Sequence, residues 1–266
     1  MVLHSSSTVI VRAAARTVYV LCLLLLEACS GLPTAFEPPV AIDVGNGRRS
    51  IGIISTIGMK FAVQKVGVTV FGNARNAVPI GAWGIDDAVN AKLEGLLRAN
   101  ADVKRIRYQE DAFAAYDAPG GLFRDHDAEL VEALRKITTN QKCDLYLVVV
   151  PSGSSFGSTN QAVTGIGIVQ GGSVFVNQIW THALFQMRLY DGRTLQLLGW
   201  KRARLAETAF MAAIHGPHRQ VDPSLWPEAG RLESNMRLRT AVRELVEQAL
   251  TETLPEVLTL DHSKRG

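Results

Sequence analysis

The strongest limit on the fold is a short segment that has no polar face. Residues 144–150 read DLYLVVV, which after Asp144 is an uninterrupted apolar run ending before Pro151. The run is shorter than an ordinary helix, and its valines favour a strand. A strand that is apolar on both sides has to be covered on both faces, so it belongs in the centre of a sheet between helices. The sequence therefore predicts an α/β fold built around this strand.

Three further segments have the apolar periodicity of helices that pack through one face. The first covers residues 85–99 and has two aspartates near its N-terminal end, where negative charge is favourable. The second can be capped by either Asp125 or Asp127, and the third begins near Met236. We therefore expect about three helices to flank the sheet.

Two pairs of segments rich in Ile, Val and Thr are predicted to form hairpins. Residues 50–57 and 61–71 are separated by a short break that allows them to pair. Residues 173–190 and 194–205 flank the pair Asp191-Gly192, which is a strong signal for a type I′ turn. The complete pattern predicts an α/β fold with a mixed sheet, about three helices, and a long C-terminal β-hairpin before the last helix.

The N-terminal residues have the organisation of a secretory signal. Arg12 and Arg16 precede an apolar run at 17–26, and the small residue Ala28 stands directly before Cys29. The apolar run is too short to span a bilayer comfortably. It therefore predicts a secretory signal and not a membrane-spanning helix.

Composition sets the expected organisation of the rest of the chain. Residues 29–48 contain three prolines and little periodicity, which is typical of an extended tether. We therefore predict a signal peptide at 1–28, a lipidated tether at 29–48 and a single α/β domain at 49–266. Of the three cysteines, only Cys143 falls within that domain, so no disulfide inside it is expected.

The sequence Leu26-Glu27-Ala28-Cys29 resembles the lipobox of bacterial lipoproteins. In those proteins the signal is cut before the cysteine, whose thiol carries a diacylglyceryl group and whose new amino group is acylated. The resemblance therefore implies a lipid anchor on Cys29. Glu27 departs from the pattern, which usually has a small or apolar residue there. A plain secretory signal cut near Ala28 and an uncleaved amphipathic anchor are the alternatives. Ser30, in place of an aspartate, resembles lipoproteins sent on to the outer membrane.

The location that this resemblance implies is the periplasmic face of the outer membrane, with the domain anchored by lipid. The alternative is a soluble periplasmic or secreted protein. The predicted order of elements resembles the periplasmic α/β domain of the curli-secretion channel lipoprotein, of the lipoprotein activators of penicillin-binding proteins, and of the Tol translocation protein at its N-terminus. This resemblance covers roughly residues 49–254 and contains no diagnostic motif. The lipid address, together with the absence of a coherent active site in the sequence, predicts a non-enzymatic domain that binds another envelope protein or glycan and that can oligomerise.

The least ordinary stretch is PSGSSFGSTNQAVTGIGIVQGG at 151–172, which has neither helical periodicity nor charge. Uncharged loops and exposed aromatic side chains suit recognition, so we predict that this stretch faces the partner, with Trp83 and Trp226 as further contacts. For Trp83 a lid over the core is the more common role of such a residue, and an exposed contact is the alternative. The residues chosen for the partner loop are Ser152, Ser155, Phe156, Gly165 and Gly167.

One string within that stretch suggests a serine hydrolase as an alternative function. Residues 153–157, GSSFG, match the G-x-S-x-G pattern that presents a nucleophilic serine in α/β-hydrolases, which here would be Ser155. The helix that must follow the nucleophile is not predicted, because glycines and threonines occupy its place. The residues available to complete a triad are Asp191, Asp222, His215, His218 and His262, and nothing in the sequence brings them together.

A second alternative is a subunit of an oligomeric outer-membrane export assembly. Residues 165–176 have alternating apolar side chains, and in the secretion-channel relatives a membrane hairpin extends from such a domain. A membrane strand needs about ten alternating residues, and several subunits are needed to close a barrel. A hairpin within the domain's own sheet therefore explains this segment better.

Charge and motif content argue against several other functions. The net charge is +3 and is scattered along the chain, whereas nucleic-acid binding normally requires a basic stripe, so no nucleic-acid partner is expected. His215 and His218 are a close pair without a third ligand at suitable spacing, so no metal site is predicted. The glycine pairs near residue 165 lack the residues of a phosphate-binding loop, and no cofactor is expected.

Overall fold

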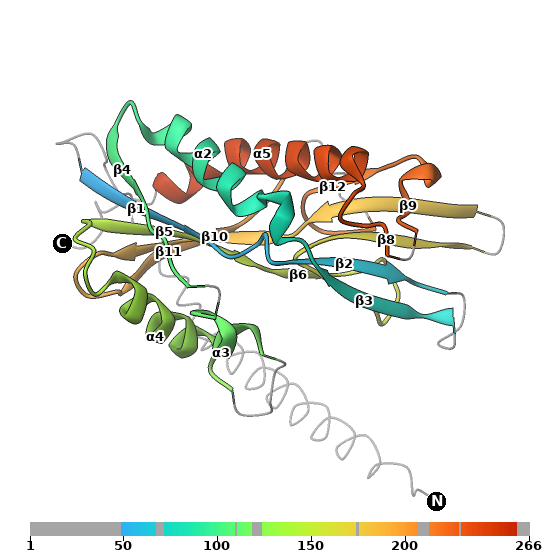
Figure 1. Cartoon of the computed structure of the whole chain (residues 1–266), viewed down its shortest axis with the longest axis horizontal. Coiled ribbons are helices and arrows are strands. Elements are labelled where there is room, and N and C mark those ends of the chain that lie inside the picture. Colours follow the sequence, from blue (N-terminus) through green and yellow to red (C-terminus); the bar gives the residue numbers. More distant parts are fainter. Residues whose placement is uncertain are drawn as a thin grey trace, which may run out of the picture. The chain divides into compact units, whose positions relative to one another are not determined.

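The computed structural model describes residues 49–67, 72–109, 111–118, 124–173, 176–206, 213–228 and 230–259. The predicted signal peptide, the predicted tether and Cys29 lie outside these ranges. Within them the chain forms a mixed α/β domain, which confirms the predicted fold class (Figure 1). The strands of this part of the chain are divided between two five-stranded sheets and a small hairpin.

The first sheet has the predicted apolar strand at its centre. Its described strands follow the order β11-β10-β5-β1-β4, with β5 at Leu145–Pro151. Strand β1 (Arg49–Ser55) is parallel to both β5 and β4 (Ala101–Arg105). On the other side of β5, β10 (Phe185–Asp191) and β11 (Leu197–Arg202) continue the sheet in antiparallel pairs.

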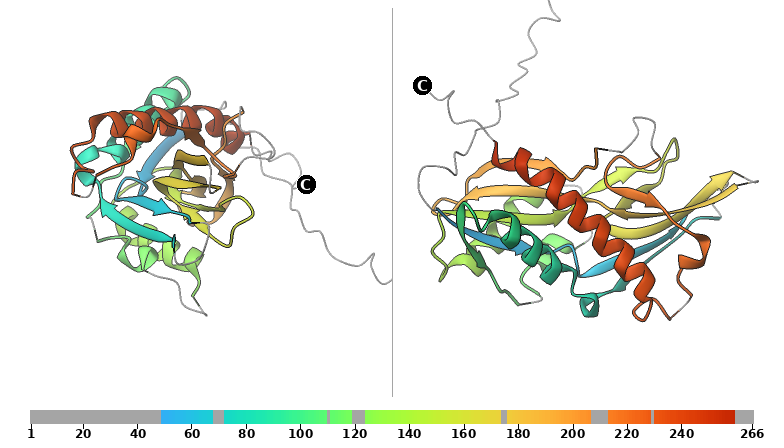
Figure 2. Two further views of the ribbon diagram at one scale, coloured as in Figure 1. Left: turned by 90° about the vertical axis from the view of Figure 1, so that its right-hand side faces the viewer. Right: turned by 90° about the horizontal axis from the view of Figure 1, so that it is seen from above.

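Helices cover both faces of this sheet, as the apolar pattern of β5 requires. Helices α2 (Ile85–Leu97) and α5 (Met236–Leu258) lie together on one face, and α4 (His126–Thr138) lies on the other with the short α3 (Ala114–Asp117) (Figures 1 and 2). Accordingly, alternate side chains of β5 belong to different cores. Leu147 packs with α2 and α5, whereas the neighbouring valine on the opposite face packs with α4.

Capping explains where α4 begins. The carboxylate of Asp125 accepts hydrogen bonds from the backbone nitrogens of Asp127 and Ala128, at 3.1 and 3.0 Å. Asp125 is therefore the N-cap, and Asp127 lies inside the first turn. With α2 and α5, this gives three main helices in the described part of the chain, as predicted.

The second sheet continues from the ends of the first. Its described strands follow the order β12-β9-β8-β2-β3, in which only β2 and β8 are parallel. The chain passes directly from β1 into β2, and from β9 through Leu184 into β10. The strands of the second sheet are β2 (Lys60–Lys65), β3 (Ala74–Pro79), β8 (Ile166–Ser173), β9 (Val176–Ala183) and β12 (His218–Gln220).

The predicted hairpin between residues 50–57 and 61–71 is wrong. Strand β1 pairs with β4 and β5, and β2 pairs with β3 and β8, so the two segments lie in different sheets. The backbone nitrogen of Thr56 still donates to the carbonyl of Val149 at 3.0 Å, which keeps the chain extended past the end of β1. The short break between the strands therefore carries the chain onward and does not reverse it.

The predicted C-terminal hairpin is confirmed where β10 and β11 pair, but residues 176–183 of its first segment form β9 in the second sheet, and its turn is not of type I′. Strands β10 and β11 pair antiparallel, and the residue with positive φ in their turn is Leu195, at 55°. The carboxylate of Asp191 accepts from the backbone nitrogens of Arg193 and Thr194, at 3.0 and 2.7 Å. This side-chain turn lengthens the connection and takes the place of the two-residue turn that Asp191-Gly192 predicts.

Candidate functional site

The stretch predicted to face a partner is mostly folded into strands. Residues 151–172 contain β6 (Gly153–Ser155), a turn, β7 (Ala162–Thr164) and most of β8. Ser155 is exposed and Ser152 is half-buried. Among the described residues, the exposed part of the stretch is therefore centred on Ser155 and the turn at 157–160.

Two of the predicted partner residues are buried inside the fold and are not part of its surface. Phe156 is 5% exposed, and its ring lies 5.5 Å from that of Trp180 in an edge-to-face arrangement. Gly167 is buried, and a Cβ atom there would lie 2.5 Å from the carbonyl oxygen of Ala62. Gly165 is half-buried with φ at 62°, a conformation that favours glycine.

The described residues around Ser155 do not form a nucleophile elbow. Phe156 forms a β-bridge with Ile214, and a turn and β7 stand where a hydrolase would have a helix. The backbone nitrogen of His215 donates to Ser154 Oγ at 2.9 Å, so this contact does not involve the imidazole.

The acids available for a triad are engaged elsewhere, and His262 lies outside the described residues. Asp191 binds its own turn, as described above, and Asp222 accepts from the backbone nitrogen of Ser224 at 2.8 Å. Within the ranges that the structure covers, no group of three or more His, Cys, Asp or Glu side chains is placed to hold a metal ion.

A cavity of about 260 Å³ lies where the two sheets meet. Its walls come from the residues directly after β1, from β2 and β3, from the ends of α3, β5 and β7, and from the start of β8. Strands β4 and β5 lie on opposite sides of β1, and the helices that precede them, α2 and α4, lie on opposite faces. In open α/β sheets such a reversal leaves a crevice beyond the carboxyl ends of the strands, where ligands bind. The cavity is therefore the candidate site.

The cavity combines an apolar lining with a few charged groups. Its apolar lining residues are Ile57, Met59, Ala62, Ala77, Pro151 and Ile166. Lys60 and Arg75 bring positive charge, and Asp117 brings a carboxyl group whose pKa is raised by burial and lowered by Lys60. One guanidinium nitrogen of Arg75 donates to Thr164 Oγ1 at 2.5 Å. A pocket that is mainly apolar with a few convergent polar groups is the usual form of a small-molecule site.

Thr56 adds a buried polar atom to this lining. The residue is 3% exposed, and its Oγ1 has no hydrogen-bond partner among the described residues. Most buried hydroxyl groups in folded proteins are paired, so an orphan of this kind calls for an explanation.

A second group of polar residues holds in place the segment after β1 that forms one wall of the cavity. Ser55 Oγ donates to Asp86 Oδ1 at 2.5 Å, and the backbone nitrogen of Gly58 donates to the same oxygen at 3.0 Å. The hydroxyl of Tyr108 donates to the carbonyl of Ser55. Burial raises the pKa of Asp86 to about 6, against the lowering effect of its hydrogen bonds with Ser55, Gly58 and the backbone of Ile57. Asp86 thus ties the first turn of α2 to the segment that forms the cavity wall.

Replacing Asp86 by Asn is expected to raise the free energy of unfolding at pH 8. The folded state binds the proton more tightly than the unfolded state between pH 3.8 and about 6. The stability that the protonated acid gives is present below this window and is lost as the pH rises through it, by up to about 3 kcal/mol. Asn stays neutral, and its Oδ1 can still accept from Ser55 and Gly58.

Urea unfolding of the two proteins at pH 8 and pH 4 checks this expectation. The gain should be present at pH 8 and vanish at pH 4. Asp87→Asn is the matched control, because Asp87 lies in the same helical turn but is exposed, and its loss should cost about 0.3–1 kcal/mol. An Asp86→Asn protein no more stable at pH 8 than Asp87→Asn would contradict the argument.

Sequence reasoning missed most of this cavity. Of the predicted site residues only Gly165 lines it, beside residues from six separate strands and helices and from the segment after β1. The one local signal was the polar pair Ser55-Thr56 at the end of an apolar strand.

The structure decides between the two interpretations of Trp83. Trp83 is 1% exposed and donates from Nε1 to the carbonyl of Glu233 at 3.1 Å, so it is a lid over the core and not a partner contact. Trp226 is partly buried against the main core. Trp200 on β11, which the sequence analysis did not single out, is 48% exposed.

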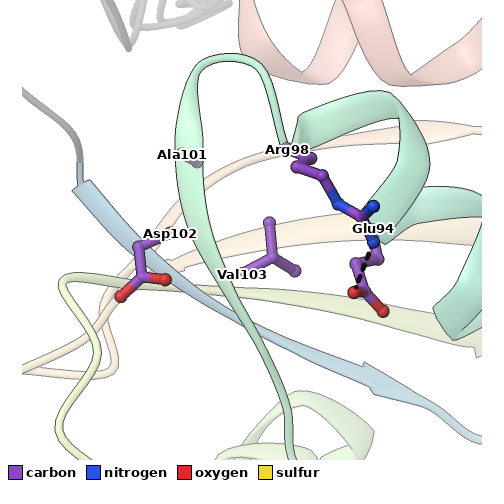
Figure 3. A pocket seen from close by; sticks show the side chains of 5 residues that line it. All are labelled: Glu94, Arg98, Ala101, Asp102 and Val103. Carbon is purple, nitrogen blue, oxygen red and sulfur yellow. Dashed lines mark hydrogen bonds and ion pairs between the residues drawn. The ribbon is translucent and has the colours of Figure 1, made fainter.

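A larger surface hollow of about 520 Å³, between α2 and β4, is a weaker candidate (Figure 3). Glu94 there forms ion pairs with Arg98 and Arg105, at 2.8 and 2.7 Å. Most of its charged groups are therefore already satisfied within the protein. Separately, the described residues include no helix long and apolar enough to cross a membrane.

These features define a mixed α/β domain with a cavity between its sheets. No protein-family model and no curated protein matches the sequence. Among solved structures, lipoprotein GNA1162 from Neisseria meningitidis is similar at 14% identity and a TM-score of 0.30, covering 74% of this chain and 97% of that chain. The C-terminal domain of LpoB from Salmonella enterica is similar at 12% identity and a TM-score of 0.23, covering 60% and 84%.

A third solved structure is a neuraminyllactose-binding hemagglutinin homolog from Helicobacter pylori. It is similar at 7% identity and a TM-score of 0.35, covering 83% of this chain and 89% of that chain. The predicted resemblance to envelope lipoproteins is thus present in the fold, at low sequence identity. These likenesses concern the fold alone.

Proposed function

We propose that this chain is a non-enzymatic lipoprotein of the bacterial cell envelope, anchored by lipid on Cys29. The observation that carries the proposal is the sequence Leu26-Glu27-Ala28-Cys29 after an apolar run of signal-peptide length. The proposed location is the periplasmic face of the outer membrane. The proposed tether between the lipid and the domain is residues 29–48.

The proposed work of the domain is to bind another envelope protein or glycan. The described geometry supports binding over hydrolysis, because Ser155 is followed by a turn and a strand and its candidate acids are engaged elsewhere. The proposed contact surface consists of Ser155 and the turn at 157–160, the exposed part of the stretch singled out in the sequence. Trp200 is a further exposed aromatic side chain suited to an interface.

Intact-mass measurement of the protein extracted from its native membrane tests the anchor. We expect a lipid-sized mass increment on a chain that begins at Cys29, and its complete loss in Cys29→Ala. Cys143→Ala is the matched control, because Cys143 is the free, buried cysteine of the domain and its replacement should leave the increment in place. An unmodified chain beginning near Cys29 in the wild type would refute the lipid anchor and leave a soluble periplasmic or secreted protein.

A further inference from the structure

The cavity between the sheets has unbalanced positive charge. Its lining contains two cationic side chains, Lys60 and Arg75, and one carboxyl group, Asp117. Neither cation forms an ion pair with any residue in the described ranges. One guanidinium nitrogen of Arg75 donates a hydrogen bond to the hydroxyl of Thr164. This bond holds the guanidinium in place and leaves its other N–H groups available to a ligand. With Asp117 ionised, the lining therefore carries a net charge of +1, on side chains that are exposed to solvent beside the apolar part of the cavity.

The orphan hydroxyl of Thr56 is a second observation that points to a ligand. Thr56 lines the cavity, is 3% exposed, and has no partner for Oγ1 among the described residues. A buried hydroxyl without a partner destabilises the empty protein. A ligand atom that pairs with it removes this penalty, so the cost in the empty state becomes a gain on binding.

We propose that this cavity binds a small organic acid that carries one carboxylate on a short apolar body. Arg75 and Lys60 hold the carboxylate, since the planar guanidinium suits a carboxylate acceptor. The apolar body packs over Ile57 and Pro151, and Thr56 Oγ1 pairs with a polar atom of the ligand. This inference concerns the cavity alone and does not depend on the lipid anchor or on the proposed partner.

Size and charge select this class over other anions. The volume of about 260 Å³ is below the roughly 300–1,000 Å³ of drug-sized sites, so the ligand is small. A monoanion matches the net charge of +1 on the lining. A phosphate dianion would meet repulsion from Asp117 and would place polar oxygens against the apolar lining, because it has no apolar body of its own.

Calorimetric titration of the full chain with benzoate tests the site, with benzyl alcohol as the neutral analogue and inorganic phosphate as the competing anion. Benzoate should bind more tightly than either. Arg75→Gln should weaken benzoate binding at least about tenfold, the effect of losing one charge-assisted hydrogen bond. Arg237→Gln is the matched control, because Arg237 is exposed on α5, which packs on the face with the main core, and this change should have no effect.

Two further variants separate binding from folding. Thr56→Val is nearly isosteric, and it should raise Tm while lowering benzoate affinity, a combination that a purely structural threonine would not give. Asp117→Asn removes the nearby carboxyl group and should increase benzoate affinity. The proposal is overturned if millimolar benzoate gives no binding, if benzyl alcohol or phosphate binds as well as benzoate, or if Arg75→Gln and Arg237→Gln behave alike.

Discussion

Gly192→Ala is expected to lower the free energy of unfolding by at least about 3 kcal/mol, the upper range for overpacking a tight contact. A Cβ atom at this position would lie 1.9 Å from the carbonyl oxygen of Cys143 and 2.7 Å from the carbonyl carbon of Asp144. Both neighbours are backbone atoms at the start of the central strand, so neither can rotate away. The φ angle of Gly192 is not positive, so the expected cost comes from the clash alone.

The clash would spread because this contact joins three strands. The backbone nitrogen of Gly192 donates to the carbonyl of Asp144 at 2.8 Å. The carboxylate of Asp144 accepts in turn from the backbone nitrogen and from the hydroxyl of Ser50, both at 2.8 Å. Pushing the β10–β11 turn away from β5 therefore disturbs the start of β1 as well.

Urea unfolding of the full chain measures the effect. Gly95→Ala is the matched control, because Gly95 lies inside α2 with open space at its Cβ position. There the same substitution should stabilise the protein by about 0.5–1 kcal/mol through helix propensity. A Gly192→Ala protein within about 1 kcal/mol of the wild type would show that the turn can move without cost, against the cost expected from overpacking.

The elements whose burial is visible as a local pattern of apolar residues were predictable from the sequence. The central place of β5 follows from its lack of a polar face, and each main helix is visible as a repeating apolar stripe. Strand pairing was not predictable in the same way. The segments that became β1 and β2 have the local pattern of a hairpin, and only the contacts of Asp86 and of distant strands show that the chain runs on between two sheets.

The stretch at 151–172 shows a different limit. Its serines and glycines suggested a loop. The structure instead buries Phe156, Val163 and Val169 in one small core, although these apolar residues were visible in the sequence. The cavity could not be predicted locally, because its walls come from distant parts of the chain. Arg75 and Thr164, which are in contact across it, are 89 residues apart.

Protonation of His182 should lower the stability of the folded protein in acid. The residue is fully buried, and its Nδ1 lies 3.0 Å from the carbonyl oxygen of Gly165. Burial lowers the pKa of His182 from 6.5 to about 4. Its Nε2 has no partner in the described part of the chain, so a second proton on the ring would be buried without an acceptor.

The sign of the effect follows from proton uptake. Between pH 6.5 and about 4 the unfolded state takes up a proton on this histidine that the folded state does not. Stability is therefore complete above this window and falls as the pH is lowered through it, by up to about 3 kcal/mol. Asp86 acts in the opposite direction over much of the same range, because its raised pKa gives stability as the pH falls. In the wild type the two groups should largely cancel.

Separating the two groups by substitution should reveal both slopes. In Asp86→Asn, stability should fall by about 3 kcal/mol between pH 7 and pH 4, since the histidine then acts without opposition. In His182→Asn the side-chain amide can still donate to Gly165, and stability should rise as the pH falls. The lost ring volume lowers absolute stability, so the slope with pH is the quantity to compare. If the slopes of the two variants are equal, the buried histidine is not the acid-sensitive group.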